Sequence, residues 1–286
     1  MALRSWLIVP ADNEAKLAKV PAAGADVVVL DLSSIEEPAK AAARGNAYQF
    51  LLRAEHQLGQ GKRFARWVRI NPIGSPHWKE DLDAAIAGKP DGIVLPRAMG
   101  AQQVQALAAE VYELEQKAGA VHNSVRIVPQ VGDAPEAALM IPQFLQDPHP
   151  RILGLSFDAH ALAAAMHMAS ADNDATRAVR AQLLLAAKAR GLMAIESASG
   201  LVKQVDLLTA SVRRARADGF DGMMARHPSQ VPVIDDIFTR SEDELDAARE
   251  IVAAYENVSE VQVLTVAGRS ADRVALERAQ RLLRED

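Results

Sequence analysis

The run DVVVLDL (26–32) consists almost entirely of β-branched and aliphatic residues, and a helical pattern follows it. Continuous apolar runs of this length are typical of strands that are buried on both faces, as in a parallel sheet covered by helices. The chain contains eight such runs: SWLIVP (5–10), DVVVLDL (26–32), RWVRIN (66–71), DGIVLP (91–96), VRIVPQ (125–130), ILGLSFD (152–158), LMAIES (192–197) and FDGMMARH (220–227). Eight strands that alternate with helices close a barrel, so the sequence predicts an α/β fold of the TIM (β/α)8 barrel type.

Alanine-rich amphipathic segments separate these runs and predict helices. The clearest segments are 13–24, 37–58, 101–119 and 173–191. Three of them stop at a glycine, the residue preferred in the left-handed conformation that follows many helices. Asp12 precedes the first segment, and we expect its side chain to cap that helix.

The pattern changes after the eighth run. Residues 241–258 predict a helix with a serine cap and acidic residues in its first turn. A short connection follows at 259–270, and the pattern then predicts a final helix at 271–285. We therefore expect two domains, a β/α barrel over residues 1–238 and a C-terminal helical extension over residues 239–286.

The composition narrows the class of protein. The chain has 286 residues, a formal net charge of −5 and no cysteine. An acidic chain does not suit nucleic acid or an anionic membrane as a partner, and without cysteine there is no disulfide or thiolate chemistry. No apolar run approaches the roughly 18 residues of a membrane span, and the first segment predicts a strand rather than a signal peptide. We expect a cytoplasmic protein with a small-molecule partner.

The active sites of β/α barrels lie at the carboxyl ends of the strands. These ends carry Asp31, Arg69, Arg97, Gln130, Asp158, Glu196 and His227. Because an unpaired buried charge is costly and a guanidinium fork suits a carboxylate, we expect Arg69 to bind a substrate carboxylate or thioester. The alternative is a structural ion pair between Arg69 and Asp31 or Glu196.

Two other residues at the strand ends have more than one interpretation. Glu196 could be a general base if burial raises its pKa, or it could be a partner for Arg69 or a loop cap. His227 could act as a general acid or base. We favour a structural role for His227, in which its ring forms hydrogen bonds to loop carbonyls.

Several stretches resemble one known family. They are RSWLIVPAD (4–12), GADVVVLDL (24–32), VRINPIGSP (68–76), DGIVLPRA (91–98), GFDGMMARHPSQ (219–230) and GRSADR (268–273). In this order they resemble the citrate lyase β-subunit branch of the HpcH/HpaI aldolase family. The resemblance implies a TIM barrel, a homotrimer, and a C-terminal extension that covers the active site of an adjacent subunit. It also implies carbon–carbon lyase activity on acyl-CoA or acyl-carrier thioesters of citrate, malate or citramalate, with Mg²⁺.

The resemblance also assigns expected roles to individual residues. It makes Arg69 the arginine that holds the substrate and Asp272 an aspartate that lies beside the reacting centre of a neighbouring subunit. Asp31 and His227 fall on the family pattern, and Arg97 takes the position of a common lysine. We include Asp31, Arg97 and His227 among the expected substrate-binding residues. Asp272 could instead cap the last helix.

The metal-ligand positions depart from the family. Gln130 occupies the place of the glutamate after the fifth strand, and Ala161 lies where an aspartate is expected after the sixth. Mg²⁺ prefers carboxylate oxygens, so the sequence predicts a site that holds Mg²⁺ poorly and uses Gln130 to contact the substrate. Asp158 could replace the lost ligand only if the local backbone were rearranged. Ser33 and Ser34 replace a further acidic pair.

These observations leave three hypotheses. The first is a carbon–carbon lyase or thioesterase-like enzyme that acts on a short hydroxy-acyl-CoA, with Arg69 binding the acid and Asp272 near the reacting centre. The second is a catalytically inactive or accessory barrel that binds an acyl-CoA or a carboxylate. The third is an enzyme whose chemistry has changed to suit Gln130, Ser33 and Ser34.

Overall fold

Eight parallel strands form the main sheet of the computed structural model, which describes residues 3–56, 63–146, 149–256 and 263–284. The strands lie in the order β5-β4-β3-β2-β1-β8-β7-β6. They are β1 (Ser5–Pro10), β2 (Val27–Asp31), β3 (Ala65–Arg69), β4 (Gly92–Leu95), β5 (Arg126–Pro129), β6 (Gly154–Ser156), β7 (Met193–Glu196) and β8 (Gly222–Ala225). Parallel bridges from Ile127 to Ile152 and from Gln130 to Ser156 connect the two ends of this order. The strands therefore form a barrel, which confirms the predicted fold class.

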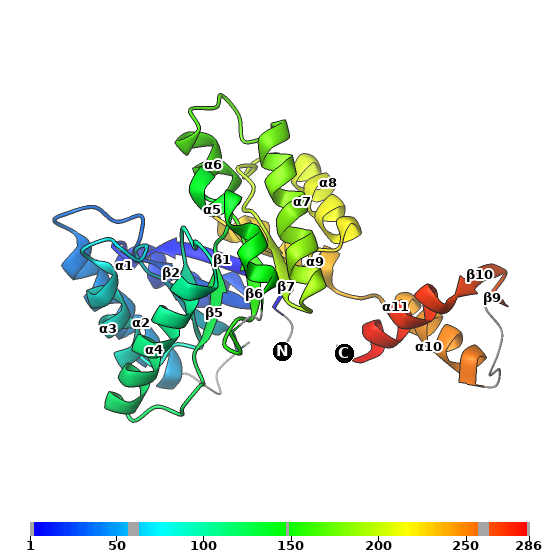
Figure 1. The fold of residues 1–286 in the computed structure, drawn as a ribbon, viewed down its shortest axis with the longest axis horizontal. Coiled ribbons are helices and arrows are strands. Elements are labelled where there is room, and N and C mark those ends of the chain that lie inside the picture. The colour runs from blue at the N-terminus through cyan, green and yellow to red at the C-terminus, as the bar shows by residue number, and fades with distance from the viewer. Residues whose placement is uncertain (1–2, 57–62, 147–148, 257–262, 285–286) are drawn as a thin grey trace. The chain divides into compact units, whose positions relative to one another are not determined.

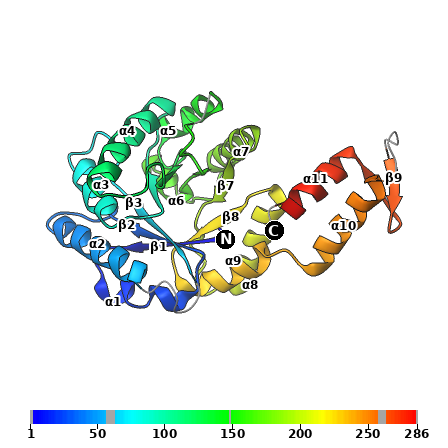
Figure 2. The ribbon, with the colours of Figure 1, turned by 90° about the horizontal axis from the view of Figure 1, so that it is seen from below.

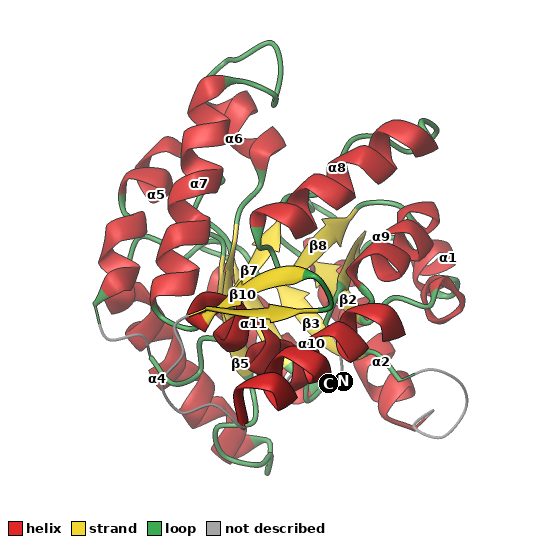
Figure 3. Cartoon of the chain, turned by 90° about the vertical axis from the view of Figure 1, so that its right-hand side faces the viewer, coloured by secondary structure: helices red, strands yellow, loops and turns green. Residues whose placement is uncertain are grey.

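Helices surround the strands (Figures 1 and 3). In chain order they are α1 (Glu14–Leu17), η1 (Val20–Ala23), α2 (Lys40–His56), α3 (Trp78–Ala87), α4 (Ala101–Lys117), α5 (Pro135–Leu139), η2 (Ile141–Leu145), α6 (Ala159–Ala165), α7 (Asp174–Ala189), α8 (Val205–Asp218), η3 (Pro228–Gln230) and α9 (Val231–Phe238). Gly24, Gly119 and Gly191 adopt positive φ angles at helix ends, as expected. The predicted cap at Asp12 is wrong by one residue, because the side chain of Asn13 accepts the hydrogen bond from the Lys16 N–H.

Alternate residues of each strand belong to two different cores. One cluster contains Trp6, Val27, Val29, Trp67, Val94, Val128, Ile195, Ala198 and Met224. Among the described residues no helix contributes to this cluster, so it fills the inside of the barrel. Their strand neighbours, such as Val68 and Ala194, pack instead with helix residues such as Leu82 and Leu183 in a second and larger cluster. The parity of a residue in its strand therefore decides whether its side chain faces the barrel axis or the helices.

The same alternation places three polar side chains at the mouth of the barrel. Asp31 and Arg69 end β2 and β3, are paired in register, and follow the interior residues Val29 and Trp67 by two positions. Gln130 follows the interior residue Val128 by two positions. Asp31, Arg69 and Gln130 therefore point inward at the carboxyl ends of their strands.

The chain divides into two compact units, the barrel unit Met1–Phe238 and a second unit Thr239–Asp286. It contains α10 (Glu242–Glu256), β9 (Val263–Val266), β10 (Arg269–Asp272) and α11 (Arg273–Arg284) (Figure 2). Ser241 and Glu244 cap α10 reciprocally, as the sequence predicts. The Tyr255 hydroxyl donates to the Ala271 carbonyl at 2.8 Å.

The second unit differs from the prediction in its connection between helices. The described part of the stretch 259–270 is an antiparallel hairpin, with Ala267 and Gly268 at positive φ in its turn. Residues 259–262 lie outside the described residues. The last helix begins at Arg273 rather than at residue 271, because Ala271 and Asp272 still pair with β9.

Candidate active site

Arg69 is the centre of the polar cluster at the barrel mouth. Its Nε donates to Gln130 Oε1 at 2.9 Å, and its Nη1 donates to Ser33 Oγ at 2.6 Å and to Asp31 Oδ2 at 3.3 Å. Ser33 Oγ in turn donates to Asp31 Oδ1 at 2.8 Å. The Arg69 side chain is 12% exposed. The structure thus brings Arg69, Asp31 and Gln130 together and makes Ser33 part of the same network.

One nitrogen of Arg69 is left available. Nη2 makes no hydrogen bond to any described residue, and its nearest acidic partner is Asp133 Oδ2 at 3.8 Å. This separation is too long for a hydrogen bond. The N–H groups on Nη2 can therefore bind an oxygen of a small molecule in the mouth.

Asp133 is a residue of this site that the sequence reasoning missed. It follows β5 and is 4% exposed, and its two carboxylate oxygens accept the Arg97 backbone N–H at 3.1 and 3.0 Å. Burial raises its pKa to about 6, although the Arg97 N–H and the charge of Arg69 oppose this change. The sequence offered one signal for Asp133, which is an acidic residue in the loop after a predicted barrel strand. This signal is weak because such loops contain many polar residues.

Arg97 contributes to the site through its backbone. Its φ angle is 49°, in the left-handed region that costs free energy for a residue other than glycine. This conformation accompanies the contact between its N–H and Asp133. The Arg97 side chain is exposed, and its guanidinium forms no ion pair within the described ranges.

A second ion pair lies at the strand ends on the other side of the barrel. Arg226 Nη2, after β8, donates to both oxygens of Asp158, after β6, at 3.0 and 2.9 Å. Asp158 Oδ1 also accepts the N–H groups of His160 and Ala161 and so caps α6. The sequence reasoning did not single out Arg226.

Glu196 does not face the mouth, so it is not a partner of Arg69. It follows the interior residue Ile195 by one position, and its carboxylate forms an ion pair with Arg180 of α7. Burial raises the pKa of Glu196, and the charge of Arg180 opposes this change. The alternative in which Glu196 pairs with Arg69 is therefore wrong, because alternate residues of a strand face opposite sides of the barrel wall.

His227 is exposed and has local partners. Its Nδ1 accepts the Ser229 N–H at 3.2 Å and lies 2.8 Å from Ser229 Oγ, so the ring caps η3. The partner is an N–H and a hydroxyl rather than a carbonyl. This geometry fits the structural interpretation, and the second ring nitrogen forms no hydrogen bond to a described residue.

Two further features surround the cluster. Asn71 donates to Asp81 Oδ2 through its backbone N–H at 2.8 Å and its side chain at 2.6 Å, and Arg44 donates to the other oxygen of Asp81. These contacts attach the end of β3 to α2 and α3.

Ser156 is fully buried on the inward side of β6, and its hydroxyl has no hydrogen-bond partner among the described residues.

The residues at the positions where the resemblance led us to expect metal ligands do not fit a divalent cation. Gln130 Oε1 accepts from Arg69, and Ala161 offers no side-chain oxygen. The oxygens of Asp158 are taken by Arg226 and by the start of α6. Across the described ranges, no group of three or more histidine, aspartate or glutamate residues is placed to hold a metal ion.

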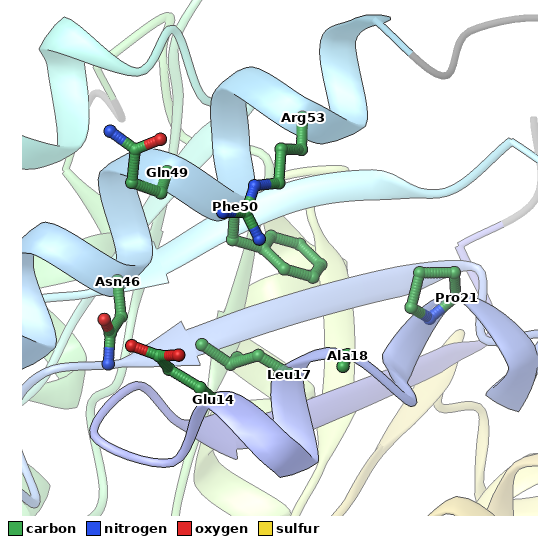
Figure 4. Close-up of a pocket in the computed structure, with 8 residues that line it drawn as sticks. All are labelled: Glu14, Leu17, Ala18, Pro21, Asn46, Gln49, Phe50 and Arg53. Carbon is green, nitrogen blue, oxygen red and sulfur yellow. The ribbon is translucent and has the colours of Figure 1, made fainter.

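A separate cleft of about 310 Å³ lies between α1, η1 and α2. Its lining consists of Glu14, Leu17, Ala18, Pro21, Asn46, Gln49, Phe50 and Arg53 (Figure 4). None of these residues belongs to the strand-end cluster, and they bring together no reactive pair. The chemistry of the strand ends therefore identifies the candidate site better than the presence of this cleft.

The fold and the cluster together define a β/α barrel with a buried guanidinium, a group suited to small anionic molecules, at the carboxyl ends of its strands. The chain belongs to the HpcH/HpaI aldolase/citrate lyase family, whose model matches residues 4–228. No helix in the described residues is both long and apolar enough to cross a membrane.

Three similar proteins illustrate the range of this family. The "Citrate lyase subunit beta-like protein" of Mycobacterium tuberculosis is 32% identical over 98% of this chain and 94% of its own. The "(3S)-malyl-CoA thioesterase" of Cereibacter sphaeroides is 28% identical over 88% of this chain and 83% of its own. The crystal structure of M. tuberculosis CitE with magnesium, acetoacetate and coenzyme A has a TM-score of 0.73 at 31% identity, and covers 99% of this chain and 97% of that one.

Proposed function

We propose that this chain binds a short hydroxy-acyl-CoA thioester, of the citryl, malyl or citramalyl type, at the barrel mouth and cleaves its carbon–carbon bond. The observation that carries the proposal is the guanidinium of Arg69, one terminal nitrogen of which forms no hydrogen bond to a described residue. Three of its contacts hold it in place, while this nitrogen, Nη2, lies 3.8 Å from Asp133 Oδ2. The names of the similar proteins, a citrate lyase β-like protein and a malyl-CoA thioesterase, support the choice of substrate class.

The chemistry needs a positive charge and a base. The hydroxyl O–H bond breaks and a carbonyl forms, while the bond between the α and β carbons breaks and its electrons enter the thioester enolate. Protonation of the α carbon then gives an acyl-CoA and an oxo acid. Arg69 can hold the carboxylate and the developing carbonyl oxygen, because it is buried and kept in place before the reaction.

This route uses no metal, because the donor atoms described above do not fit one. The M. tuberculosis CitE structure contains magnesium. In this chain Gln130 and Ala161 stand at the family's ligand positions, so we propose that the guanidinium supplies the charge. Asp31 and Gln130 serve to position Arg69, and Arg97 and His227 are the further substrate contacts that we propose on the rim.

A second function is favoured by the same substitutions. The mismatch at Gln130 and Ala161 also suits a barrel that binds an acyl-CoA or carboxylate without turnover, as an accessory or regulatory subunit. The two functions differ in whether bound thioester is consumed.

We further propose that the chain is a cytoplasmic homotrimer in which residues 239–286 cover the mouth of a neighbouring subunit. Asp272 would then lie beside the reacting centre. Its Oδ1 accepts the Ala275 N–H at 2.8 Å, which is the contact of a helix cap, and the residue is exposed. Light scattering tests the trimer. Mixing Arg69→Ala and Asp272→Asn subunits should restore part of the activity that each variant lacks, because some sites then combine two intact residues; no recovery contradicts the shared site.

The main test is incubation of the protein with malyl-CoA, citramalyl-CoA or citryl-CoA in the presence of EDTA. Formation of acetyl-CoA and an oxo acid supports the lyase. Formation of free CoA and the hydroxy acid identifies a thioesterase, and tight binding without products identifies the accessory function. Arg69→Ala that binds these thioesters as well as the wild type would contradict the site itself.

A further inference from the structure

Asp133 and Arg69 face each other across a short gap in the mouth of the barrel. Asp133 Oδ2 lies 3.8 Å from Arg69 Nη2, and no side chain in the described ranges donates a hydrogen bond to the Asp133 carboxylate. The groups that donate to it are backbone N–H groups, chiefly that of Arg97. Each of the two facing groups therefore keeps capacity for one more partner.

One oxygen atom can satisfy both groups. Two atoms 3.8 Å apart have common positions that are about 2.9 Å from each, which is an ordinary hydrogen-bond length. An oxygen there accepts from Nη2 and must donate to Oδ2. A hydroxyl group does both, whereas a carboxylate or carbonyl oxygen cannot donate.

We propose that Asp133 is a catalytic residue of this site, the base that takes the hydroxyl proton of the thioester bound at Arg69. This inference rests on the proposed function. The proton moves from the substrate oxygen to the Asp133 carboxylate as the carbonyl forms and the carbon–carbon bond breaks. The enolate carbon then takes a proton from water, and Asp133 releases its proton to water, so the cycle balances.

The surroundings of Asp133 suit this task. Burial raises its pKa to about 6, and the charge of Asp158 adds to the effect, while Arg69 and the Arg97 N–H lower it. The carboxyl is therefore mostly ionised at neutral pH, yet basic enough to accept a proton. Arg97 contacts this carboxylate through its backbone N–H, and its side chain is exposed; a second guanidinium beside the carboxylate would make it a weaker base.

The chain contains a matched control. Glu196 is also a buried carboxyl with a raised pKa, but it follows an inward residue by one position and pairs with Arg180 outside the mouth. The structure predicts that the two acids differ in function although their burial is alike. Asp133→Asn and Glu196→Gln each replace a carboxyl by an amide of the same shape.

The test is the pH dependence of thioester cleavage by the wild type and the two variants. In the wild type kcat/KM should rise with pH through a midpoint near the Asp133 pKa of about 6. Asp133→Asn should lose about 100-fold or more in kcat with little change in KM, and should lose this rise, because it has no base. Glu196→Gln should keep the wild-type kcat and the rise with pH, and Asp133→Glu should recover part of the kcat that Asp133→Asn loses. An Asp133→Asn enzyme with wild-type kcat overturns the proposal and leaves the proposed function standing.

If the wild type cleaves none of the thioesters, the proposed function has failed, and the contact is tested by binding. The carboxyl titration of Asp133 is followed by carbon NMR with saturating malate and with saturating succinate, which differ by one hydroxyl. The midpoint should be lower with malate, because a hydroxyl that donates to the ionised carboxylate favours that form. Equal midpoints would overturn the role of Asp133.

Discussion

Asp133 and Glu196 are two buried acids whose pKa values are both raised by burial, and they lie on opposite sides of the barrel wall. Glu196 faces the helices and is bound directly by Arg180. Asp133 faces the mouth, where the nearest guanidinium stops 3.8 Å away. The difference shows that burial alone does not make an acid reactive. A buried acid is available for chemistry when its cationic neighbour leaves room for a third group.

The arginines repeat this contrast. Arg151 is 3% exposed, and its two terminal nitrogens donate to the two oxygens of the fully buried Glu115 at 2.8 and 2.7 Å. A further hydrogen bond goes to the Val125 carbonyl. Arg69 is nearly as buried, but one of its terminal nitrogens makes no hydrogen bond to a described residue. Arg151 and Glu115 therefore stabilise the fold, while Arg69 can bind a ligand.

The largest effect is expected at Arg69. Arg69→Ala removes the charge that holds the substrate, and we expect kcat/KM to fall by about 1000-fold, as loss of a buried charge contact does. The matched control is Arg66→Ala, at the other end of β3, where an equally buried arginine pairs with Asp91. Arg66→Ala should keep kcat/KM within a few-fold. Steady-state kinetics on both variants measure this difference. If Arg66→Ala lost as much kcat/KM as Arg69→Ala, the contrast between the two arginines would be wrong.

The structural side of the comparison is tested at Glu115. Glu115→Gln leaves the Arg151 charge buried without its counter-ion, so the free energy of unfolding should fall by about 3–5 kcal/mol. Urea denaturation measures this loss. Activity per folded molecule should not change, and a selective loss of activity would contradict a purely structural pair.

Asp133→Asn should raise the free energy of unfolding at neutral and higher pH, although it lowers kcat. The folded pKa of about 6 lies above the ordinary 3.8, so this group's contribution is fully present below pH 3.8 and is lost as the pH rises through about 6. The difference between the two pKa values corresponds to roughly 3 kcal/mol. The variant should therefore be more stable than the wild type at pH 8, by up to that amount, with the gain shrinking toward pH 4. Denaturation at several pH values measures it, and a gain that does not depend on pH would contradict the raised pKa.

The smallest effect is expected for metal removal from the wild type. EDTA should change its activity by less than about two-fold, because the donor set at the mouth lacks the carboxylates that Mg²⁺ prefers. Restoring both acids, as Gln130→Glu with Ala161→Asp, should create Mg²⁺ binding that calorimetry detects. Micromolar Mg²⁺ binding by the wild type would contradict this part of the proposal.

Sequence reasoning located part of the candidate site. Arg69, Asp31 and Gln130 were found because each ends a recognisable apolar run, and the ends of parallel strands meet at one edge. Glu196 was grouped with them because the last three residues of β7 are all buried, so the strand shows no alternation that reveals which positions face inward. The hairpin of β9 and β10 was missed because its strands are short and largely exposed, and so lack a strong alternation.

The amino-acid sequence by itself determined the eight strands, their alternation with helices and the glycines that end several helices. Each of these depends on residue type within a few positions along the chain. Only the tertiary structure decided that Arg69 keeps one open nitrogen, that Asp133 faces it, and that Glu196 turns to Arg180 instead. These relations join residues 38 to 64 positions apart or depend on strand parity, and closure of the barrel sets both. For this reason Arg69 could be predicted from the sequence, whereas Asp133, the base that we propose, could not.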